Sequence, residues 1–539
     1  MSRPSAPREW ARRAARSAYV GSLRLRRRSG PWVWQRLPAW LRRPYETVET
    51  FDAHAYLAGL VSDLSAVLHR NGVEHLILDQ RLLGLPRVAI RRDDAPAVMR
   101  ALAGDPSTRR WWAARSEAGV VGLPAPVAWR TTSTFGVSGI LLSRNLLSPS
   151  GAPLTDAETG VLLEFWIRED TETLATGGGL HQPGTVHGPT HNGILDYAGP
   201  ALWAEIQANA HRLPARPPHL LQLSEPVDLV YTWVDGDDPA WLRRKAAALG
   251  DRDLSGVSVD AEIAARFENR DELRYSLRSV EMFANWAHRI WVVTDQQVPA
   301  WLRQDERLRI VDHREIFADP SALPVYNSHA IESQLHHIPG LAEHYLYLND
   351  DMLFGARAQP EDFFHGNGIS KFFTSPALLD IGGHDPGDLA VAAAAKNNRD
   401  LIEAEFGRTI VHKLRHTPQP QVRSVIEGFE ADHPELFDAV MRSRLRHASN
   451  YSLTSSLSQY YAFAVRRAVP GRIDYGYVDL AAERPEVTLE RWLRRRRRLT
   501  FCINDSGDDD AASRARKDAA LREFFEVYFP LPSRWEIPT

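Results

Sequence analysis

Polar side chains interrupt an apolar run at residues 345–355, which read YLYLNDDMLFG. The run predicts a buried strand that ends at Asn349, Asp350 and Asp351, after which the apolar residues resume. Asn and Asp favour turns, so these three residues could simply break a hairpin. Two adjacent carboxylates at the end of a core strand could instead hold a divalent metal ion, because such ions take oxygen ligands. This stretch alone is compatible with both interpretations.

Two further apolar runs in the same half of the chain end in an acid. The run DLVYTWV leads to Asp235, and the run IWVVT leads to Asp295. Carboxylates from three neighbouring strand ends would repel one another unless a cation or hydrogen-bond donors compensate. A magnesium or manganese ion with a bound diphosphate would supply that compensation. We therefore expect a divalent metal site at this edge of the sheet.

Basic side chains recur at helical spacing near these strand ends. Arg270, Arg274 and Arg278 lie four residues apart, so a helix would carry them on one face. The face can be a solvated surface with internal ion pairs. It can also neutralise a substrate phosphate.

A helix start in residues 326–340, YNSHAIESQLHHIPG, is a second candidate phosphate site. Ser328 is the predicted N-cap, with Asn327 and His329 on either side. The free N–H groups of a helix N-terminus bind phosphate readily. We expect Asn327 and Ser328 to contact phosphate, and His329 to be either a base or a structural cap.

The elements between residues 228 and 317 must bring these strand ends together. Strands and helices alternate there, which predicts parallel pairing in an open, doubly wound α/β sheet of Rossmann-like type. In such a sheet the ligand crevice lies at the carboxyl ends of the strands. The expected elements are the strands 228–236, 289–295 and 308–317 and the helices 271–287 and 300–306.

Composition shifts divide the 539-residue chain into five expected parts. A Pro-rich stretch near Arg216 predicts an extended linker, because proline restricts the residue before it. The parts are a basic Arg/Trp-rich arm (1–46), a small α/β domain of unknown role (47–215), the linker (216–226), a catalytic domain with helical insertions (227–530) and a tail (531–539).

Bulk composition excludes several classes of protein. The single cysteine, Cys502, excludes an internal disulfide framework and a Cys-based zinc cluster. We find neither a secretory signal nor about 18 consecutive apolar residues for a membrane span, so we expect a cytoplasmic protein. The arginine-rich arm can lie on an anionic membrane surface, at the inner face of the plasma membrane, or be a solvated arm. No nucleic-acid reading module accompanies it, so we expect no nucleic-acid partner.

Three histidines in the Gly-rich stretch 177–193 could suggest another metal site. His181, His187 and His191 have no supporting helix or acid pattern around them. We therefore expect a surface loop.

Four blocks of the C-terminal half, in their order along the chain, resemble the conserved blocks of the Stealth family of sugar-phosphate transferases. The resemblance covers about residues 225–530. It implies a nucleotide-sugar transferase-like fold, transfer of a sugar-1-phosphate from a UDP-sugar to an acceptor sugar hydroxyl, a phosphodiester product, and release of UMP. The implied cofactor is magnesium or manganese, and the implied partners are the UDP-sugar donor and a saccharide or phosphosaccharide acceptor. The matching stretches are 228–241, 266–302, 323–355, 412–462 and 501–505.

The same resemblance assigns roles to individual residues. It implies a nucleotide-sugar site around Asp235, Arg274 and Asp295, and a metal or sugar-phosphate site at Asn349, Asp350 and Asp351. His416 is the implied catalytic base, because an imidazole accepts a proton near neutral pH. Arg444 and Arg446 are implied phosphate binders, and Asn504 is a further metal ligand or a plain turn residue.

Two other functions remain open on the sequence. A metal-dependent glycosyltransferase would use the same acids but attack the sugar carbon and release UDP. A non-catalytic carbohydrate-binding surface protein would keep the blocks as scaffold. The donor sugar, the acceptor and the oligomeric state are not indicated.

Overall fold

The computed structural model describes residues 45–78, 84–117, 120–121, 125–127, 137–155, 159–174, 180–189, 193–214, 217–250, 269–385, 387–505, 507 and 511–538. Contacts divide the chain into two compact units, Met1–Pro218 and His219–Thr539. The division falls inside the Pro-rich stretch 216–226. Almost all of the basic arm, with its proposed membrane contact, lies outside the described residues, as does His191.

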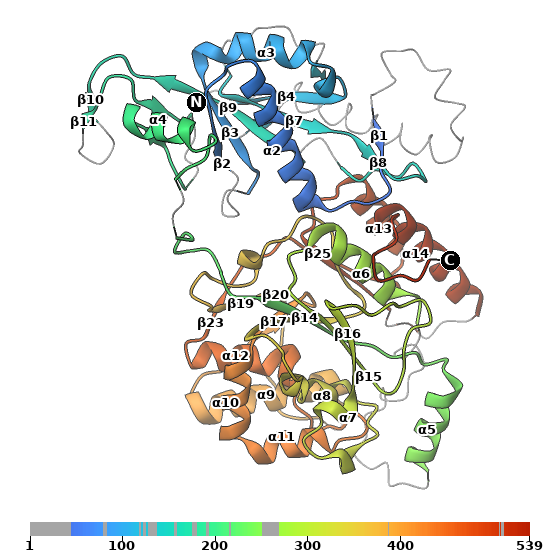
Figure 1. The fold of residues 1–539 in the computed structure, drawn as a ribbon. Helices are drawn as coiled ribbons and strands as arrows, with labels where there is room; N and C mark the ends of the chain where they lie inside the picture. The colour runs from blue at the N-terminus through green and yellow to red at the C-terminus, as the bar shows by residue number, and fades with distance from the viewer. Residues whose placement is uncertain are drawn as a thin grey trace. The chain divides into compact units, whose positions relative to one another are not determined.

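The N-terminal unit is a mixed β-sheet with helices packed on it (Figure 1). Asp52 caps the first helix, α2, by accepting from the backbone N–H of His54. Apolar residues of α2 at helical spacing pack with strands β3, β7 and β9 in one core. The principal elements are α2 (Ala53–Arg70), β2 (His75–Leu78), β3 (Arg87–Arg91), α3 (Ala95–Gly104), β4 (Trp111–Glu117), β7 (Gly139–Arg144), β9 (Val161–Arg168), β11 (Leu180–His181), β12 (Val186–His187), β13 (Tyr197–Ala198) and α4 (Pro200–Ala208).

Two of the three histidines in the Gly-rich stretch lie on short strands, where a loop was expected. His181 is in β11 and His187 is in β12, which pairs with β9 and β13. Their ring centroids are 4.5 Å apart, and the Tyr197 ring lies 4.2 Å from that of His181. Strand pairing thus brings the two rings together, in a tilted arrangement, with Tyr197.

The C-terminal unit is built on a five-stranded sheet in the order β16, β15, β14, β17, β22 (Figure 1). The first four strands are parallel, and β22 is antiparallel to β17. Their apolar runs are almost wholly buried, as expected for a sheet covered on both faces. The strands are β14 (Val227–Thr232), β15 (Ile290–Thr294), β16 (Leu308–Asp312), β17 (His344–Asn349) and β22 (Gln419–Val422).

This strand order confirms the predicted doubly wound α/β fold. The chain moves outward from β14 to β15 and β16, then returns to the other side of β14 as β17. The reversal creates a crevice between the carboxyl ends of β14 and β17, where ligands bind in open α/β sheets. Asp350 and Asp351 directly follow β17, so the topology places them at that crevice.

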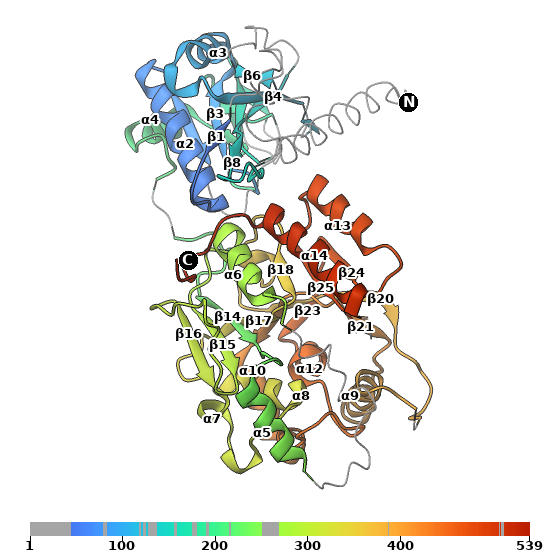
Figure 2. The ribbon, with the colours of Figure 1, turned by 90° about the vertical axis from the view of Figure 1, so that its right-hand side faces the viewer.

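A second, three-stranded sheet joins distant parts of the chain beside the crevice. It has the order β18 (Met352–Phe354), β25 (Thr500–Asn504), β24 (Tyr475–Asp479). Figure 2 shows helices α13 (Pro485–Arg494) and α14 (Ala511–Tyr528) beside it. Helix α6 (Glu272–Phe283) contacts the edge strand β18 of this sheet, because Ser276 donates to the Met352 carbonyl at 2.6 Å.

Helices α7 to α12 of the C-terminal unit lie together below the large sheet in Figure 1, and α5 stands apart from them. Among the described residues, no helix combines the length and the apolarity needed to cross a membrane. These elements are α5 (Pro239–Leu249), α7 (His313–Ile316), α8 (Ser328–Glu332), β19 (Ser370–Phe372), β20 (Thr374–Leu378), α9 (Ala390–Phe406), β21 (His412–Leu414), α10 (Arg423–Asp432), α11 (Pro434–Met441), α12 (Ser458–Ala464) and β23 (Ala468–Pro470).

The C-terminal residues correct two of the sequence expectations. Residues 300–306 form no helix, because the backbone N–H of Arg303 donates to the Trp535 carbonyl instead. Residues 531–538 are not a free tail, since Trp535 is fully buried and Glu536 is 5% exposed. Glu536 accepts from Arg274 at 2.6 Å and from two nitrogens of Arg278 at 2.7 Å. These ion pairs tie the end of the chain to α6.

Replacing Glu536 should lower the free energy of unfolding strongly, because it removes the ion pairs that connect the end of the chain to α6. We expect Glu536→Ala to lower the free energy of unfolding by about 3–5 kcal/mol, because the buried guanidinium of Arg278 and the partly buried one of Arg274 lose their partner. Urea unfolding followed by tryptophan fluorescence measures it. Asp438→Ala, which breaks an exposed pair with Arg442, is the control and should cost less than about 1 kcal/mol. Equal losses in the two variants would contradict the structural role of Glu536.

Candidate active site

Asp351 is the centre of the candidate site. One carboxylate oxygen lies 3.4 Å from Nε2 of His416, and the other accepts from Sγ of Cys502 at 3.1 Å. The three groups come from the turn after β17, the loop after β21, and β25. Their ligand atoms lie within 4.8 Å of one another. The fold thus joins three segments that are far apart in the sequence.

Two further acids crowd against Asp351. Burial and the negative charges of Glu272 and Asp351 raise the pKa of Asp350 well above its usual value. Burial also raises the pKa of Glu272 to about 7, despite hydrogen bonds from backbone N–H groups and the nearby charge of Arg270. Three carboxyl groups in this space cannot all ionise at low cost without a cation.

His416 has a buried acid on its other side. Burial alone would lower its pKa, but the charges of Asp351 and Glu332 outweigh burial and raise it. Glu332 ends α8, accepts from the Tyr347 hydroxyl at 3.3 Å and from the backbone N–H of Ser455 at 3.2 Å. Burial raises the pKa of Glu332 to about 7. His416 therefore contacts one acid, Asp351, and also feels the charge of a second, Glu332, and both favour its protonated form.

The donor set suits a hard divalent cation. The side-chain oxygen of Asn349 is buried with no hydrogen-bond partner in the part of the chain that the structure describes, and the Asp351 oxygen 3.4 Å from His416 has that ion-pair contact in place of a hydrogen bond. Unsatisfied oxygens beside excess negative charge are what magnesium and manganese bind. Burial and the charge of Asp351 keep the pKa of Cys502 well above its usual value, so the thiol stays protonated and donates.

Asn504 lies on the same face of the small sheet as this thiol. It pairs in register with Asp479, and its side-chain nitrogen lies 3.4 Å from an Asp479 carboxylate oxygen. Asp350, Asp351 and Asn504 would hold a metal ion here, with Asp479 orienting Asn504. Bound there, the ion would neutralise the charge of phosphoryl oxygens.

Asp235 and Asp295 stabilise the loops at the neighbouring strand ends. Gln297 bridges these loops by accepting from the backbone N–H of Asp235 and donating to its carbonyl. Asp295 accepts from Nε of Arg244 at 3.1 Å, and the same guanidinium reaches its carbonyl at 2.8 Å. Both acids lie at the predicted edge, but Asp295 already has a cationic partner.

The α8 segment brings together the predicted phosphate binders. Asn327, and not Ser328, caps α8, since its side-chain oxygen accepts from the backbone N–H of His329 at 3.1 Å. Its amide nitrogen donates to Asn450 at 2.8 Å, which fixes the following loop. The Ser328 hydroxyl instead accepts from Arg446 at 2.8 Å.

The arginines of that loop differ from Arg274 in their surroundings. A second guanidinium nitrogen of Arg446 is buried without a hydrogen-bond partner among the described residues, as an anion-binding arginine would be. The Arg444 carbonyl accepts from the Tyr326 backbone N–H at 2.7 Å. Arg274 already pairs with Glu536 through its Nε. His329 is buried in α8, 4% exposed.

Several residues of the site were missed by sequence reasoning. Local sequence patterns did not indicate that Glu272, Glu332, Cys502 or Asp479 belongs to the site. The sequence did contain a signal for Glu332. It lies in a short helical segment rich in polar residues, and an acid that is buried there must find hydrogen-bond partners. No such signal existed for Cys502, whose contact with Asp351 spans 151 positions.

A second cluster of potential metal ligands lies outside the site. Nε2 of His336 and Nε2 of His337 lie 2.7 and 2.9 Å from the same oxygen of Glu430. These are hydrogen-bond distances to one shared acceptor. Hydrogen bonds from both histidines, stronger together than burial, lower the pKa of Glu430 to about 2. The contacts explain the cluster as an ion pair that joins α10 to residues 335–337.

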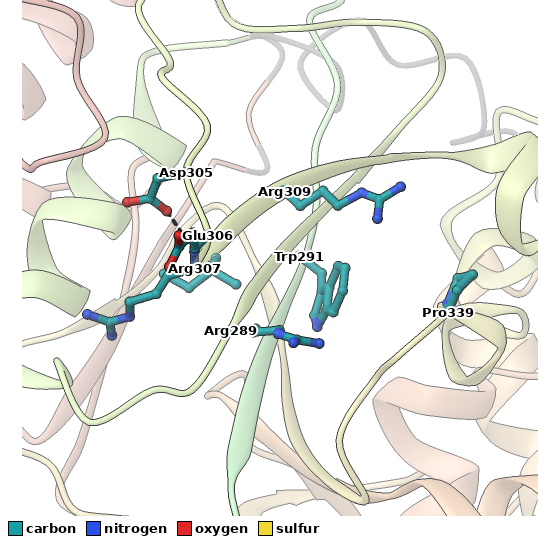
Figure 3. Close-up of a pocket in the computed structure, with 8 residues that line it drawn as sticks. Arg289, Trp291, Asp305, Glu306, Arg307, Arg309 and Pro339 are labelled. Carbon is teal, nitrogen blue, oxygen red and sulfur yellow. Dashed lines mark hydrogen bonds between the residues drawn. The ribbon is translucent and has the colours of Figure 1, made fainter.

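A pocket opens at the other edge of the large sheet (Figure 3). Arg289 and Arg307 precede β15 and β16, so this pocket faces the amino ends of the strands. Arg307 donates to Asn285 and to the carbonyl of Ala287. Its position, opposite the acids, separates it from the candidate active site.

The pKa of Glu332 should appear in the pH dependence of stability. The folded protein holds this proton up to about pH 7, whereas an unfolded glutamate releases it near 4.5. Wild-type stability should therefore fall as pH rises from about 5 to 8, by about 3 kcal/mol from this group. Glu332→Gln should reduce that fall in urea unfolding with a chelator present, and the raised pKa values of Glu272 and Asp350 should leave the rest of it. Exposed Glu435→Gln is the control, and an unchanged slope in Glu332→Gln would contradict the assignment.

Metal binding can be measured without turnover. We expect the chain to bind Mn²⁺, detected by loss of the free-ion electron paramagnetic resonance signal. Asp351→Asn should weaken this binding about tenfold or more, because the ion loses a charged ligand. Asp438→Asn on the exposed face of α11 should bind as wild type. Undiminished binding by Asp351→Asn would rule out this metal site.

Family models for four conserved regions match the C-terminal unit in chain order. They are Stealth protein conserved region 1 at residues 225–253, region 2 at 266–372, region 3 at 403–463 and region 4 at 491–539. Asp235 falls in the first, Asp350 and Asp351 in the second, His416 in the third, and Asn504 in the fourth. The residues that meet at the site thus come from all four regions.

Curated relatives share the name exopolysaccharide phosphotransferase. SCO6023 of Streptomyces coelicolor is 49% identical over 58% of this chain and 52% of its own length. SCO6021 of the same organism is 40% identical over 76% of both chains. CpsY of Mycobacterium tuberculosis is 34% identical over 88% of this chain and 87% of its own length. The chain thus spans about half of SCO6023 and most of the other two.

Among solved structures, the galactosyltransferase LgtC in complex with donor and acceptor sugar analogs matches 58% of this chain and 98% of its own. The TM-score is 0.30 and the identity 12%. The fold assignment rests on the strand order and not on this match. The four regions and the length of the CpsY and SCO6021 alignments identify the chain as a member of the Stealth family.

Proposed function

We propose that the protein transfers a hexose-1-phosphate or N-acetylhexosamine-1-phosphate from a UDP-sugar to a hydroxyl of an acceptor sugar, in exopolysaccharide or capsule synthesis. The acceptor oxygen attacks the β-phosphorus, the bond to the α-phosphate oxygen breaks, and UMP leaves. The proton of the hydroxyl goes to a base. The relatives' shared name supports phosphotransfer.

The Asp351–His416 contact is the observation that carries this proposal. A phosphoryl transfer needs charge neutralisation and positioning more than covalent chemistry. His416, oriented by Asp351 and Glu332, is the base for the acceptor hydroxyl, with His329 as the alternative base. The excess of carboxylates beside it calls for the divalent ion that a diphosphate donor also needs.

Other predicted residues have supporting places in this scheme. Asp235 and Asp295 line the edge where the nucleotide-sugar would lie, next to β14 and β15. Asn327 and Ser328, with Arg444 and Arg446, form the phosphate-binding side. Arg446 supports this role, since its partnerless nitrogen could donate to a phosphoryl oxygen.

The nucleotide product distinguishes this function from its rivals. The purified chain, incubated with Mn²⁺, a panel of UDP-sugars and oligosaccharide acceptors, should release UMP and produce a phosphodiester signal in phosphorus NMR. Asp351→Ala should lower the rate by about 100-fold or more, and Asp438→Ala should not.

The other outcomes are equally specific. Release of UDP, with a glycosidic product, would replace the proposal with a metal-dependent glycosyltransferase. Sugar binding without release of any nucleotide would indicate a carbohydrate-binding protein.

A further inference from the structure

The two faces of strand β24 differ in a way that points to a ligand. Gly476 and Val478 are buried, and a Cβ atom on Gly476 would lie 2.6 Å from the Trp492 ring of α13. Residues Tyr475, Tyr477 and Asp479 alternate with them and are less buried. One face of the strand therefore packs against a helix, and the other carries two tyrosines and an acid.

The polar face of β24 is the face directed at the candidate active site. β24 pairs in parallel register with β25, so Tyr477 lies beside Cys502 and Asp479 beside Asn504. Cys502 contacts Asp351. Tyr475 pairs with Thr500, whose hydroxyl lies 2.7 Å from that of Thr417, the residue after His416.

The Tyr475 hydroxyl is the second feature of this face that points to a ligand. It is buried and finds no hydrogen-bond partner among the described residues. The negative charge of Asp351 acts on it, and the Arg415 guanidinium lies 5.9 Å from the centre of its ring. A buried hydroxyl without a partner costs about 1–3 kcal/mol, and a bound group that accepts a hydrogen bond from it would remove that cost.

The Tyr477 ring is the exposed part of the same face. Its side chain is 48% exposed, although it lies two residues from the buried hydroxyl. An exposed aromatic ring beside polar groups offers an apolar face and polar edges. A sugar ring has an apolar C–H face and polar hydroxyl edges, so the two surfaces are complementary. The ring is thus placed to cover a ligand at the site.

Resting on the proposed function, we infer that Tyr475 and Tyr477 form a saccharide-binding wall of the active site. The Tyr477 ring stacks on the apolar face of a pyranose ring. The Tyr475 hydroxyl donates a hydrogen bond to an oxygen of the same sugar phosphate. The pyranose belongs either to the UDP-sugar or to the acceptor, and the two cases differ in which ligand loses affinity.

Three variants separate the ring from the hydroxyl. Tyr477→Leu removes the ring, Tyr477→Phe keeps it, and Tyr475→Phe removes only the hydroxyl. Tyr197→Leu, a tyrosine of the N-terminal unit with 47% exposure, is the matched control. The full-length chain with Mn²⁺ is used, and thermal unfolding confirms that each variant folds.

Initial rates and calorimetry give the expected result. Tyr477→Leu should raise KM for one sugar ligand about 5- to 10-fold, and Tyr477→Phe, which keeps the ring, should raise it less. Tyr475→Phe should lower kcat/KM about tenfold. A rise confined to the UDP-sugar assigns the wall to the donor, and a rise confined to the oligosaccharide assigns it to the acceptor.

Calorimetric titration keeps this inference separate from the proposed function. It measures UDP-N-acetylglucosamine and oligosaccharide binding without turnover. If wild type releases no UMP but Tyr477→Leu weakens binding, the function is wrong and the wall stands. If Tyr477→Leu binds and turns over like Tyr197→Leu, the wall is wrong whatever the reaction.

Discussion

Crowding of carboxyl groups at the end of β17 is the constraint on which the site depends. Asp350, Asp351 and Glu272 share a space in which their charges repel, and the repulsion shows in the raised pKa values of Asp350 and Glu272. A fold that tolerates such repulsion must offset it through packing elsewhere. The buried strands of the large sheet, and the ion pairs of Glu536 with α6, are that packing.

The strand order explains why the acids meet at this position. The reversal between β14 and β17 opens the sheet at its carboxyl edge, and the chain leaves β17 directly into the acid pair. Helix α6 then supplies Glu272 from one side, because Ser276 and Ser279 bond to the backbone of β18. Each of these contacts joins two neighbouring elements. Together they gather the three carboxyl groups into one negatively charged region.

The small sheet completes the site from the far end of the sequence. β25 places Cys502 against Asp351, and the Trp492 ring of α13 packs closely on Gly476 of the neighbouring strand β24. Opposite it, α8 holds Glu332 beside His416 and Asn327 against the loop with Arg446. The surroundings of His416 therefore come from segments that are far apart in the sequence, while its side chain stays partly exposed.

The sequence by itself determined the sheet, its hydrophobic strands and the acids at their ends, because period, length and turn residues are local properties. It also placed Asp350 and Asp351 together, since they are neighbours in the chain. It misjudged Ser328 as the cap of α8, residues 300–306 as a helix and residues 531–539 as a tail, because competing partners lie far along the chain.

Only the tertiary structure decided which charges face one another. Arg274 pairs with Glu536 although helical spacing also allowed it to face a phosphate, and the charge of Glu332 acts on His416 from a segment far away in the sequence. Side-chain contacts between distant segments depend on how the elements pack, and no local pattern encodes that geometry. The tertiary structure therefore decided the partners of Asp351, while the sequence alone had already placed that acid at the end of its strand.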